Sequence, residues 1–180
     1  MLPEVLAQVV REAGGDALLL DARKGRALLT DTSELKQVCR KLKNAGFARM
    51  VDSTAQHVGQ GEGGEDEFAL FLTLRHPAEN HAALTLKWKW IQAEDTVHPT
   101  LSRIWPAAGL AEREIFEMLG IPFDENDNLV PLLLDEQFAG NPLKLGFEDK
   151  PREDYAAALL KERHEQAMLD AARATLGGGG

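Results

Sequence analysis

A chain of 180 residues, 44% of them hydrophobic, is long enough for a compact domain with a core and an extension. Its formal net charge of −9 argues against nucleic-acid binding, which needs a local surplus of Lys and Arg, and no apolar run is long enough to cross a bilayer. The single cysteine, Cys39, excludes an internal disulfide framework and a cysteine-ligated iron–sulfur cluster held by this chain alone.

The first half of the chain predicts a helix, a short hairpin, a second helix and a further strand. Pro3 is tolerated in the first turn of the first helix, and Gly14 follows that helix as a stop signal. Thr32 or Ser33 caps the second helix, which Gly46 ends. The helices are expected at 2–13 and from the cap to 46, and the strands at 17–21 and 26–30, with a further strand that begins at 47–52.

Two later strands show strong alternation. At 68–74 large apolar residues recur at every second position, and at 84–90 they alternate with Thr85, Lys87 and Lys89. The second of these strands therefore has one buried face and one face turned to water or to a partner. The order helix, two strands, helix, three strands predicts the α+β class, as a two-layer domain with helices packed on a mixed sheet.

The character of the sequence changes after Phe123. An acidic stretch is followed by apolar residues, Gly and Pro that show neither the helical nor the strand period, up to Phe147. Such a segment cannot close a core of its own, so we expect it to lie as an extended arm across another surface. A final helix is expected at 153–176. We therefore predict an α+β core domain at 1–123 and an extended partner-binding tail with a C-terminal helix at 124–180.

The usual signatures of catalysis are missing from the sequence. The five histidines form no pair at helical spacing and no compact set with cysteine, so no metal site is predicted. His98 is interpreted as a loop histidine rather than a general base. No Gly-rich phosphate loop lies between a strand and a helix, and no serine lies in a nucleophile elbow. We predict no catalytic, cofactor-binding or metal-binding residue.

The most informative segment is 104–123, an apolar stretch that carries Glu112, Arg113, Glu114 and Glu117. It predicts a helix that Gly120 ends, with the four charges either on a solvated face or at an interface. Arg113 and Glu117 are four residues apart and can pair. Glu112 and Glu114 point away from each other on a helix, which disfavours a pair of catalytic acids. At an interface, paired charges would fix register and orientation.

This segment resembles the hallmark of the 30 kDa subunit family of respiratory complex I and of the related membrane-bound hydrogenases. The hallmark W-x-x-A-x-x-x-E-R-E, continuing to G-I-x-F, is filled in register by Trp105, Ala108, Glu112, Arg113, Glu114, Ile115, Phe116, Glu117, Met118, Leu119, Gly120, Ile121 and Phe123. A second family segment is matched by Gly140, Pro142, Leu143, Lys144 and Phe147. The resemblance covers 84–147 well and the N-terminal half in outline.

The resemblance implies a cofactor-free structural subunit in the peripheral arm of a membrane-associated redox complex of the NADH-quinone oxidoreductase type. It implies docking against the hydrogenase-like large subunit, near the iron–sulfur relay, with iron–sulfur clusters carried by partner subunits. The matched motif residues would form the interface. The expected location is peripheral, on the cytoplasmic side of the inner membrane, with the membrane reached only through partners.

The chain departs from the family after the first segment. The family pattern continues with a histidine and, further on, two arginines, where this chain has Asn126, Val130 and Pro131. The departure keeps open a second interpretation, the corresponding subunit of a membrane-bound nickel–iron hydrogenase. Two further alternatives are a free-standing small enzyme that uses the Glu cluster and a soluble adaptor or assembly factor with the same fold.

Overall fold

The computed structural model describes residues 2–79, 82–135, 138–148 and 160–161. The helices are α1 (Glu4–Gly14), α2 (Leu35–Asn44) and α3 (Ala108–Leu119), with short 3₁₀ turns η1 (Gly15–Ala17) and η2 (Thr32–Glu34). The strands are β1 (Leu18–Asp21), β2 (Arg26–Leu29), β3 (Arg49–Gln60), β4 (Asp66–His76), β5 (Ala82–Gln92), β6 (His98–Pro99) and β7 (Phe123–Asp124). Within these ranges no helix combines the length and the apolar character needed to span a membrane.

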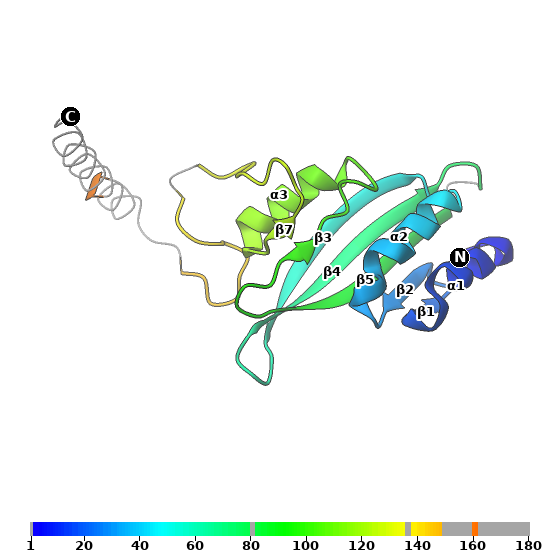
Figure 1. Ribbon diagram of the computed structural model, residues 1–180, viewed down its shortest axis with the longest axis horizontal. Helices are drawn as coiled ribbons and strands as arrows, with labels where there is room; N and C mark the ends of the chain where they lie inside the picture. The colour runs from blue at the N-terminus through cyan, green and yellow to red at the C-terminus, as the bar shows by residue number, and fades with distance from the viewer. Residues whose placement is uncertain (1, 80–81, 136–137, 149–159, 162–180) are drawn as a thin grey trace, which may run out of the picture.

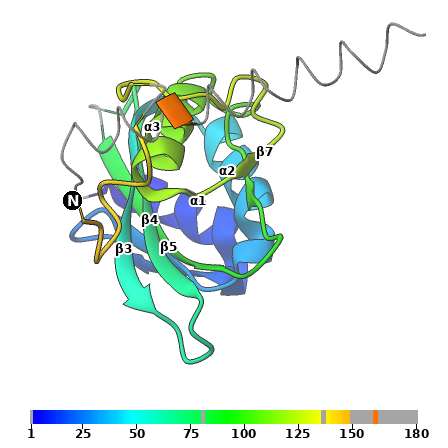
Figure 2. The same cartoon turned by 90° about the vertical axis from the view of Figure 1, so that its left-hand side faces the viewer.

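The strands form a mixed five-stranded sheet in the order β1-β2-β5-β4-β3. The β2–β5 pair is parallel and the other three pairs are antiparallel. Figure 1 shows α1 and α2 lying along this sheet, and Figure 2 shows them on one side of it. The predicted α+β class with helices on a mixed sheet is confirmed. The predicted helix at 153–176 lies outside the described residues, apart from the helical positions 160 and 161.

The core lies between the sheet and the three helices. Every second residue of β4 and β5 enters it, from Phe68 to Leu74 and from Leu84 to Trp88, as the alternation predicts. Cys39 on α2 is fully buried in the same core, and burial raises the pKa of its thiol to about 12. The thiol is therefore protonated at neutral pH and acts as a packing group.

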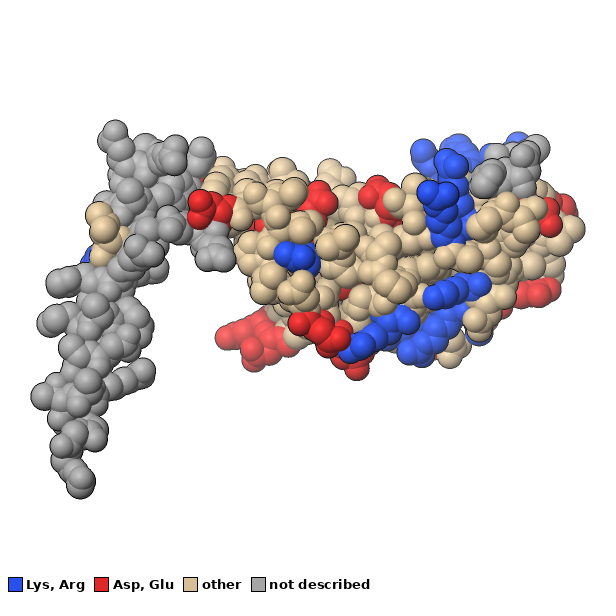
Figure 3. Space-filling model, turned by 90° about the horizontal axis from the view of Figure 1, so that it is seen from above, with Lys and Arg blue, Asp and Glu red and all other residues tan. Residues whose placement is uncertain are grey.

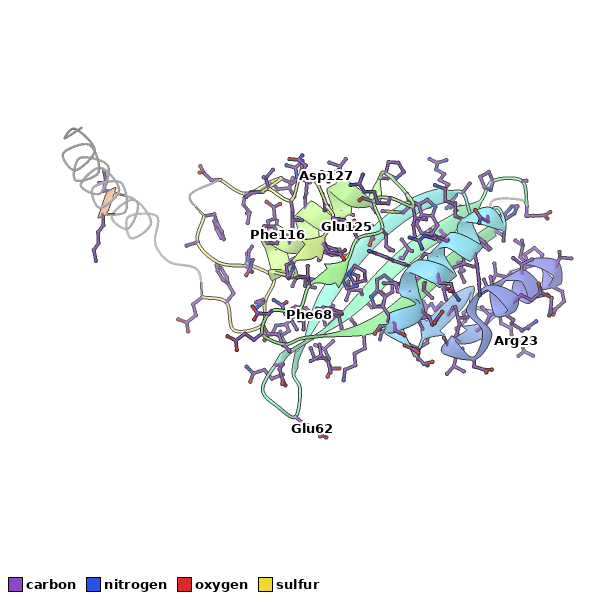
Figure 4. The ribbon with its side chains drawn as sticks, viewed as in Figure 1. Arg23, Glu62, Phe68, Phe116, Glu125 and Asp127 are labelled. Carbon is purple, nitrogen blue, oxygen red and sulfur yellow. The ribbon has the colours of Figure 1, made fainter. Side chains whose placement is uncertain are left out.

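β3 continues for twelve residues, to Gln60, although its sequence is largely polar. Pairing along the full length of β4 extends it, with register shifts at Met50/Asp52 and His57/Gly59. One detail of the predicted elements, the cap before the second helix, is wrong. The turn before α2 is capped by Asp31, whose carboxylate accepts a hydrogen bond from the Ser33 N–H at 3.0 Å. The β3–β4 connection extends away from the body, with Glu62 at its tip (Figure 4).

His98 is buried in β6, contrary to its interpretation as a loop histidine. Its Nε2 accepts a hydrogen bond from Trp88 Nε1 at 2.9 Å, and its ring lies against Trp90 and Phe123. Burial lowers the pKa of His98 to about 4. The imidazole is therefore neutral in the folded protein at physiological pH, with its proton on Nδ1 because Nε2 is the acceptor.

The buried His98 makes folding pH-dependent. As pH falls from about 6.5 to about 4, the unfolded chain takes up a proton at His98 before the folded protein does. The free energy of unfolding should therefore fall over this window by about 3 kcal/mol from this group. Urea titrations at a series of pH values should show a shallower slope for His98→Gln. Val10→Ala, a buried change on α1 that leaves the Trp88–His98 hydrogen bond in place, should lower stability at every pH while keeping the slope. An unchanged slope in His98→Gln would contradict this assignment.

Candidate partner-binding surface

Glu112 holds α3 to the segment before it. The residue is 2% exposed. One carboxylate oxygen accepts the Leu101 N–H at 2.7 Å, and the other accepts the Thr100 hydroxyl at 2.6 Å and the Asn126 amide at 2.8 Å. Burial raises the pKa of Glu112, against the hydrogen bonds that lower it. The carboxylate thus joins three chain segments inside the protein, and Asn126 supplies a donor at the position where the family pattern has histidine.

Arg113 and Glu117 hold the segment that follows α3, which we call the strap (residues 125–135 and 138–148). Arg113 donates to the Val130 and Pro131 carbonyls at 2.9 and 2.8 Å. Glu117 is 5% exposed. Its carboxylate accepts three consecutive backbone N–H groups of the strap, at 2.7 Å from Leu132, 2.9 Å from Leu133 and 3.2 Å from Leu134. Two side chains one helical turn apart therefore fix five consecutive backbone positions.

The pairing of Arg113 with Glu117 that their spacing allows does not form among the described residues. Neither residue takes part in the salt bridges found among the described residues, and both bond to the strap backbone instead. The strap has backbone carbonyls and amides to satisfy because it belongs to no sheet, and a cation and an anion on one helix satisfy both kinds. Glu114, one turn before Glu117, is exposed.

The second family segment covers the C-terminal end of α3. Gly120 ends the helix in the left-handed conformation, at φ 74°. The Asn141 amide donates to the Glu117 carbonyl at 2.9 Å, and the Leu143 N–H donates to the Met118 carbonyl at 3.0 Å. These bonds satisfy carbonyls that a helix end leaves free. The two motifs, which are separate in the sequence, thus form one structure.

Replacing Gly120 by Ala should break this junction. A Cβ at this position would lie 2.6 Å from the Asn141 side-chain oxygen, and an L-residue is strained at this positive φ. We expect a loss of about 1–2 kcal/mol in the free energy of unfolding. Chemical denaturation measures it, and Gly109→Ala, whose Cβ would meet only a Ser102 contact at 3.6 Å, is the matched control on the same helix. Equal stabilities for the two variants would contradict the role of Gly120.

The strap also contacts the end of the sheet. Lys144 pairs with Asp66 at 2.6 Å, and this pairing is the largest cause of the lowered pKa of Asp66. His57 Nδ1 accepts the Leu145 N–H at 2.9 Å, and its Nε2 lies 3.2 Å from Asp66. His57 and Asp66 lie at polar strand ends, and Asn141 is a loop residue that belongs to no motif. Nothing in the sequence therefore singles these three residues out.

The remaining predicted motif residues divide into two groups. Trp105, Ile121 and Phe123 are buried in the core, where they hold α3 in place. The Phe147 ring stacks on the Phe138 ring. The Phe147 ring also lies beside Gly140, where an added Cβ would be 3.0 Å from it. Pro142 is half-buried and Leu143 is exposed. The motif therefore builds and fixes the strap, and only part of it reaches the surface.

The surface over α3 and the strap is rich in exposed apolar side chains. They are Leu110, Val130, Leu132, Leu133, Leu143 and Leu145, with Leu133 66% and Leu145 62% exposed. We call this set the α3–strap surface. In Figure 3 the visible Lys and Arg gather mainly toward the other end of the molecule, and the half that contains α3 is mostly uncharged. Among the described residues no group of three or more His, Cys, Asp or Glu is arranged to hold a metal ion.

Comparison with known proteins identifies the family. The family described as respiratory-chain NADH dehydrogenase, 30 Kd subunit, matches residues 28–153. The chain is 29% identical over 150 residues to the C subunit of NADH-quinone oxidoreductase from Rhodobacter capsulatus, covering 81% of this chain and 72% of that protein. It is 30% identical over 135 residues to the C subunit from Moorella thermoacetica, covering 71% of this chain and 85% of that protein.

Some relatives are considerably longer than the matched region. The chain covers 40% of the C subunit from Erythrobacter litoralis, at 30% identity, and 16% of a combined C/D subunit from a Sulfurihydrogenibium species, at 33% identity. The fold is similar to that of a solved trypsin-resistant fragment (1–134) of Nqo5, with a TM-score of 0.56 and 21% identity, covering 69% of this chain and 98% of that fragment. Because the family match extends over well more than half of the sequence, this chain belongs to the family of the 30 kDa subunit of respiratory-chain NADH dehydrogenase.

Proposed function

We propose that this chain is a structural subunit of the peripheral arm of an NADH-quinone oxidoreductase and docks the hydrogenase-like large subunit near the iron–sulfur relay. It holds no cofactor of its own, and the iron–sulfur clusters belong to partner subunits. The observation that supports this proposal is the α3–strap surface. Arg113 and Glu117 hold a non-regular segment rigidly against a helix, with Leu132 and Leu133 turned outward.

Such a surface is suited to a permanent interface. Clustered exposed apolar side chains mark protein-binding sites, and a segment that is ordered before binding loses less conformational entropy on association. A cavity of about 150 Å³ lies between α3 and the strap, lined by Phe116, Pro131, Leu134 and Phe138 among others. Its size suits one inserted partner side chain. Figure 4 shows Phe116 on the part of α3 that the strap surrounds.

The names of the relatives support a large neighbouring subunit. The matched C/D chains combine two subunits under one name, and this chain corresponds to a small part of each. Such a combined chain supports direct contact between a separate C subunit and the subunit that the D part represents. We place the protein on the cytoplasmic side of the inner membrane, which it reaches only through its partners.

The test replaces the native chain by tagged variants in the source organism. Leu133→Asp and Leu145→Asp should each lower the amount of the chain recovered with the other subunits after solubilisation in mild detergent. Desolvating a carboxylate against an apolar partner costs several kcal/mol, so the expected loss is about ten-fold or more. Val5→Asp is the matched control, because Val5 lies on α1 and its side chain is 75% exposed. Normal recovery of both strap variants would refute docking through this surface.

Mass spectrometry of the recovered subunits also separates the alternatives. A flavoprotein that oxidises NADH among the partners supports the proposed complex. A nickel–iron large subunit would instead assign the chain to a membrane-bound hydrogenase, the alternative kept open by Asn126, Val130 and Pro131. Recovery of a partner-free monomer would refute both.

A further inference from the structure

The face of the sheet opposite the helices carries a groove in which apolar and cationic side chains alternate. Its volume is about 550 Å³, and it lies on β1, β2, β5 and β4. Leu19, Leu28 and Phe71 form the floor, and Arg26, Thr85 and Lys87 lie among them. We call this feature the open-face groove. It is distinct from the α3–strap surface, because α3 packs in the core on the other face of the sheet.

The floor residues lie in one row across four strands, with Lys87 between Leu28 and Phe71. Leu19 pairs with Leu28, Leu28 pairs with Lys87, and Lys87 pairs with Phe71. Leu19 is 61% and Leu28 41% exposed. A sheet face in water normally carries polar side chains at these positions, so three large apolar residues in a row of four indicate a face that another protein segment covers.

The two cations of the groove are available for a ligand. Lys87 lies over the Phe71 ring, with its Nζ 5.4 Å from the ring centroid, and neither Lys87 nor Arg26 takes part in the salt bridges found among the described residues. Asp21, which also lines the groove, lies 3.8 Å from Lys24, and Thr85 bonds to Thr73. In a chain of net charge −9, Arg26 and Lys87 outnumber the one carboxylate of the groove, Asp21, which is the register partner of Arg26, so the groove keeps a positive surplus.

From this arrangement we propose that the open-face groove docks an amphipathic helix of another subunit, with carboxylates beside its apolar stripe. The floor is too exposed to enclose a small molecule, whose sites usually bury most of the ligand. An added strand could form no backbone hydrogen bonds on a sheet face, whereas a helix satisfies its own backbone and is the usual cover for such a face. A row across four strands is roughly 14 Å long, which matches about ten helical residues.

The geometry also sets where the acids of that helix lie. Arg26 pairs with Thr85 and Leu28 pairs with Lys87, so the two cations are on adjacent strands and two residues out of register. Acids three or four positions apart on a helix lie on one face and can reach both cations. The proposal rests on membership of a complex of several subunits, but not on docking through the α3–strap surface.

A photocrosslinking amino acid at position 28 of the full-length chain, within the purified complex, tests the proposal. We expect a crosslink to another subunit of that complex, within a helical segment that carries acidic residues beside an apolar stripe. Lys87→Glu should reduce this crosslink about ten-fold, and changing the facing acid to Lys should restore it in the Lys87→Glu variant. Arg23→Glu, an exposed change in the turn between β1 and β2, should leave it unchanged.

Several results would overturn the proposal. They are a crosslink to residues 149–180 of the same chain, a crosslink to a second copy of this chain, or no protein crosslink in an intact complex. Only complex that retains this chain is scored. Failure of the α3–strap docking, which removes the chain from the complex, is therefore distinguishable from an empty groove.

Discussion

Replacing Glu117 by Gln should release residues 132–134 from α3 while the sheet and its helices stay folded. The carboxylate accepts three consecutive backbone N–H groups, and an amide of the same shape turns one acceptor oxygen into a donor that faces them. Hydrogen bonds to a charged group contribute about 1.5–3 kcal/mol each. Because all three bonds end on the same carboxylate, their contributions are not additive, and we expect strap attachment to weaken by about 2–4 kcal/mol in total.

Amide hydrogen exchange measures this release directly. Protection of Leu132, Leu133 and Leu134 should fall by about 30-fold or more, because local opening becomes cheaper by that free energy. Core amides on β4 and β5 should keep their protection. Glu114→Gln, at an exposed position on the same helix, is the control and should leave strap exchange unchanged. Unchanged protection in Glu117→Gln would show that other contacts hold this stretch.

The same variant connects structure to function. In the proposed interface the exposed leucines bind as a preformed set, and their geometry depends on the clamp formed by Arg113 and Glu117. A released strap must be ordered again on binding, which reduces the affinity by the cost of ordering. Glu117→Gln should therefore weaken recovery in the complex, although its side chain is only 5% exposed.

Much of the fold is predictable because its signals are local. The alternation in β4 and β5 specifies which face is buried, and Gly120 marks the end of α3 by its need for a positive φ. The sequence predicts where β3 begins but not how far it extends, because its register comes from the neighbouring strand and not from its own polar sequence. Strand pairing is a long-range interaction that a single segment does not encode.

The sequence motif singles out residues that hold the strap, but it does not show which groups they bind. The motif identifies Glu112, Arg113 and Glu117 as special, but helical spacing suggests that the last two pair with each other. They bind the strap instead, because its backbone groups are brought to α3 by the tertiary fold. The interpretation of His98 as a loop residue fails for a similar reason, since the strand pair that buries it joins segments more than twenty residues apart.

Glu112→Ala should be the most destabilising single change in the motif. It leaves the Leu101 N–H, the Thr100 hydroxyl and the Asn126 amide without their acceptor, in a site where Glu112 is 2% exposed. Loss of a buried group that satisfies several polar partners costs about 3–5 kcal/mol, a large share of the stability of a small domain. Urea denaturation measures the loss, and Glu114→Ala is the matched control, with an expected change within about 0.5 kcal/mol.

The pH dependence of Glu112 separates its charge from its hydrogen bonds. Because burial raises its pKa, the folded protein takes up a proton at Glu112 at a higher pH than the unfolded chain does, whose value is 4.5. The stability advantage of the wild type over Glu112→Gln should therefore shrink as pH rises through the window just above 4.5. His98 has the opposite sign in wild type and variant alike, so it cancels in the difference. A difference that grows with pH would mean that the hydrogen bonds outweigh burial and hold the carboxylate ionised.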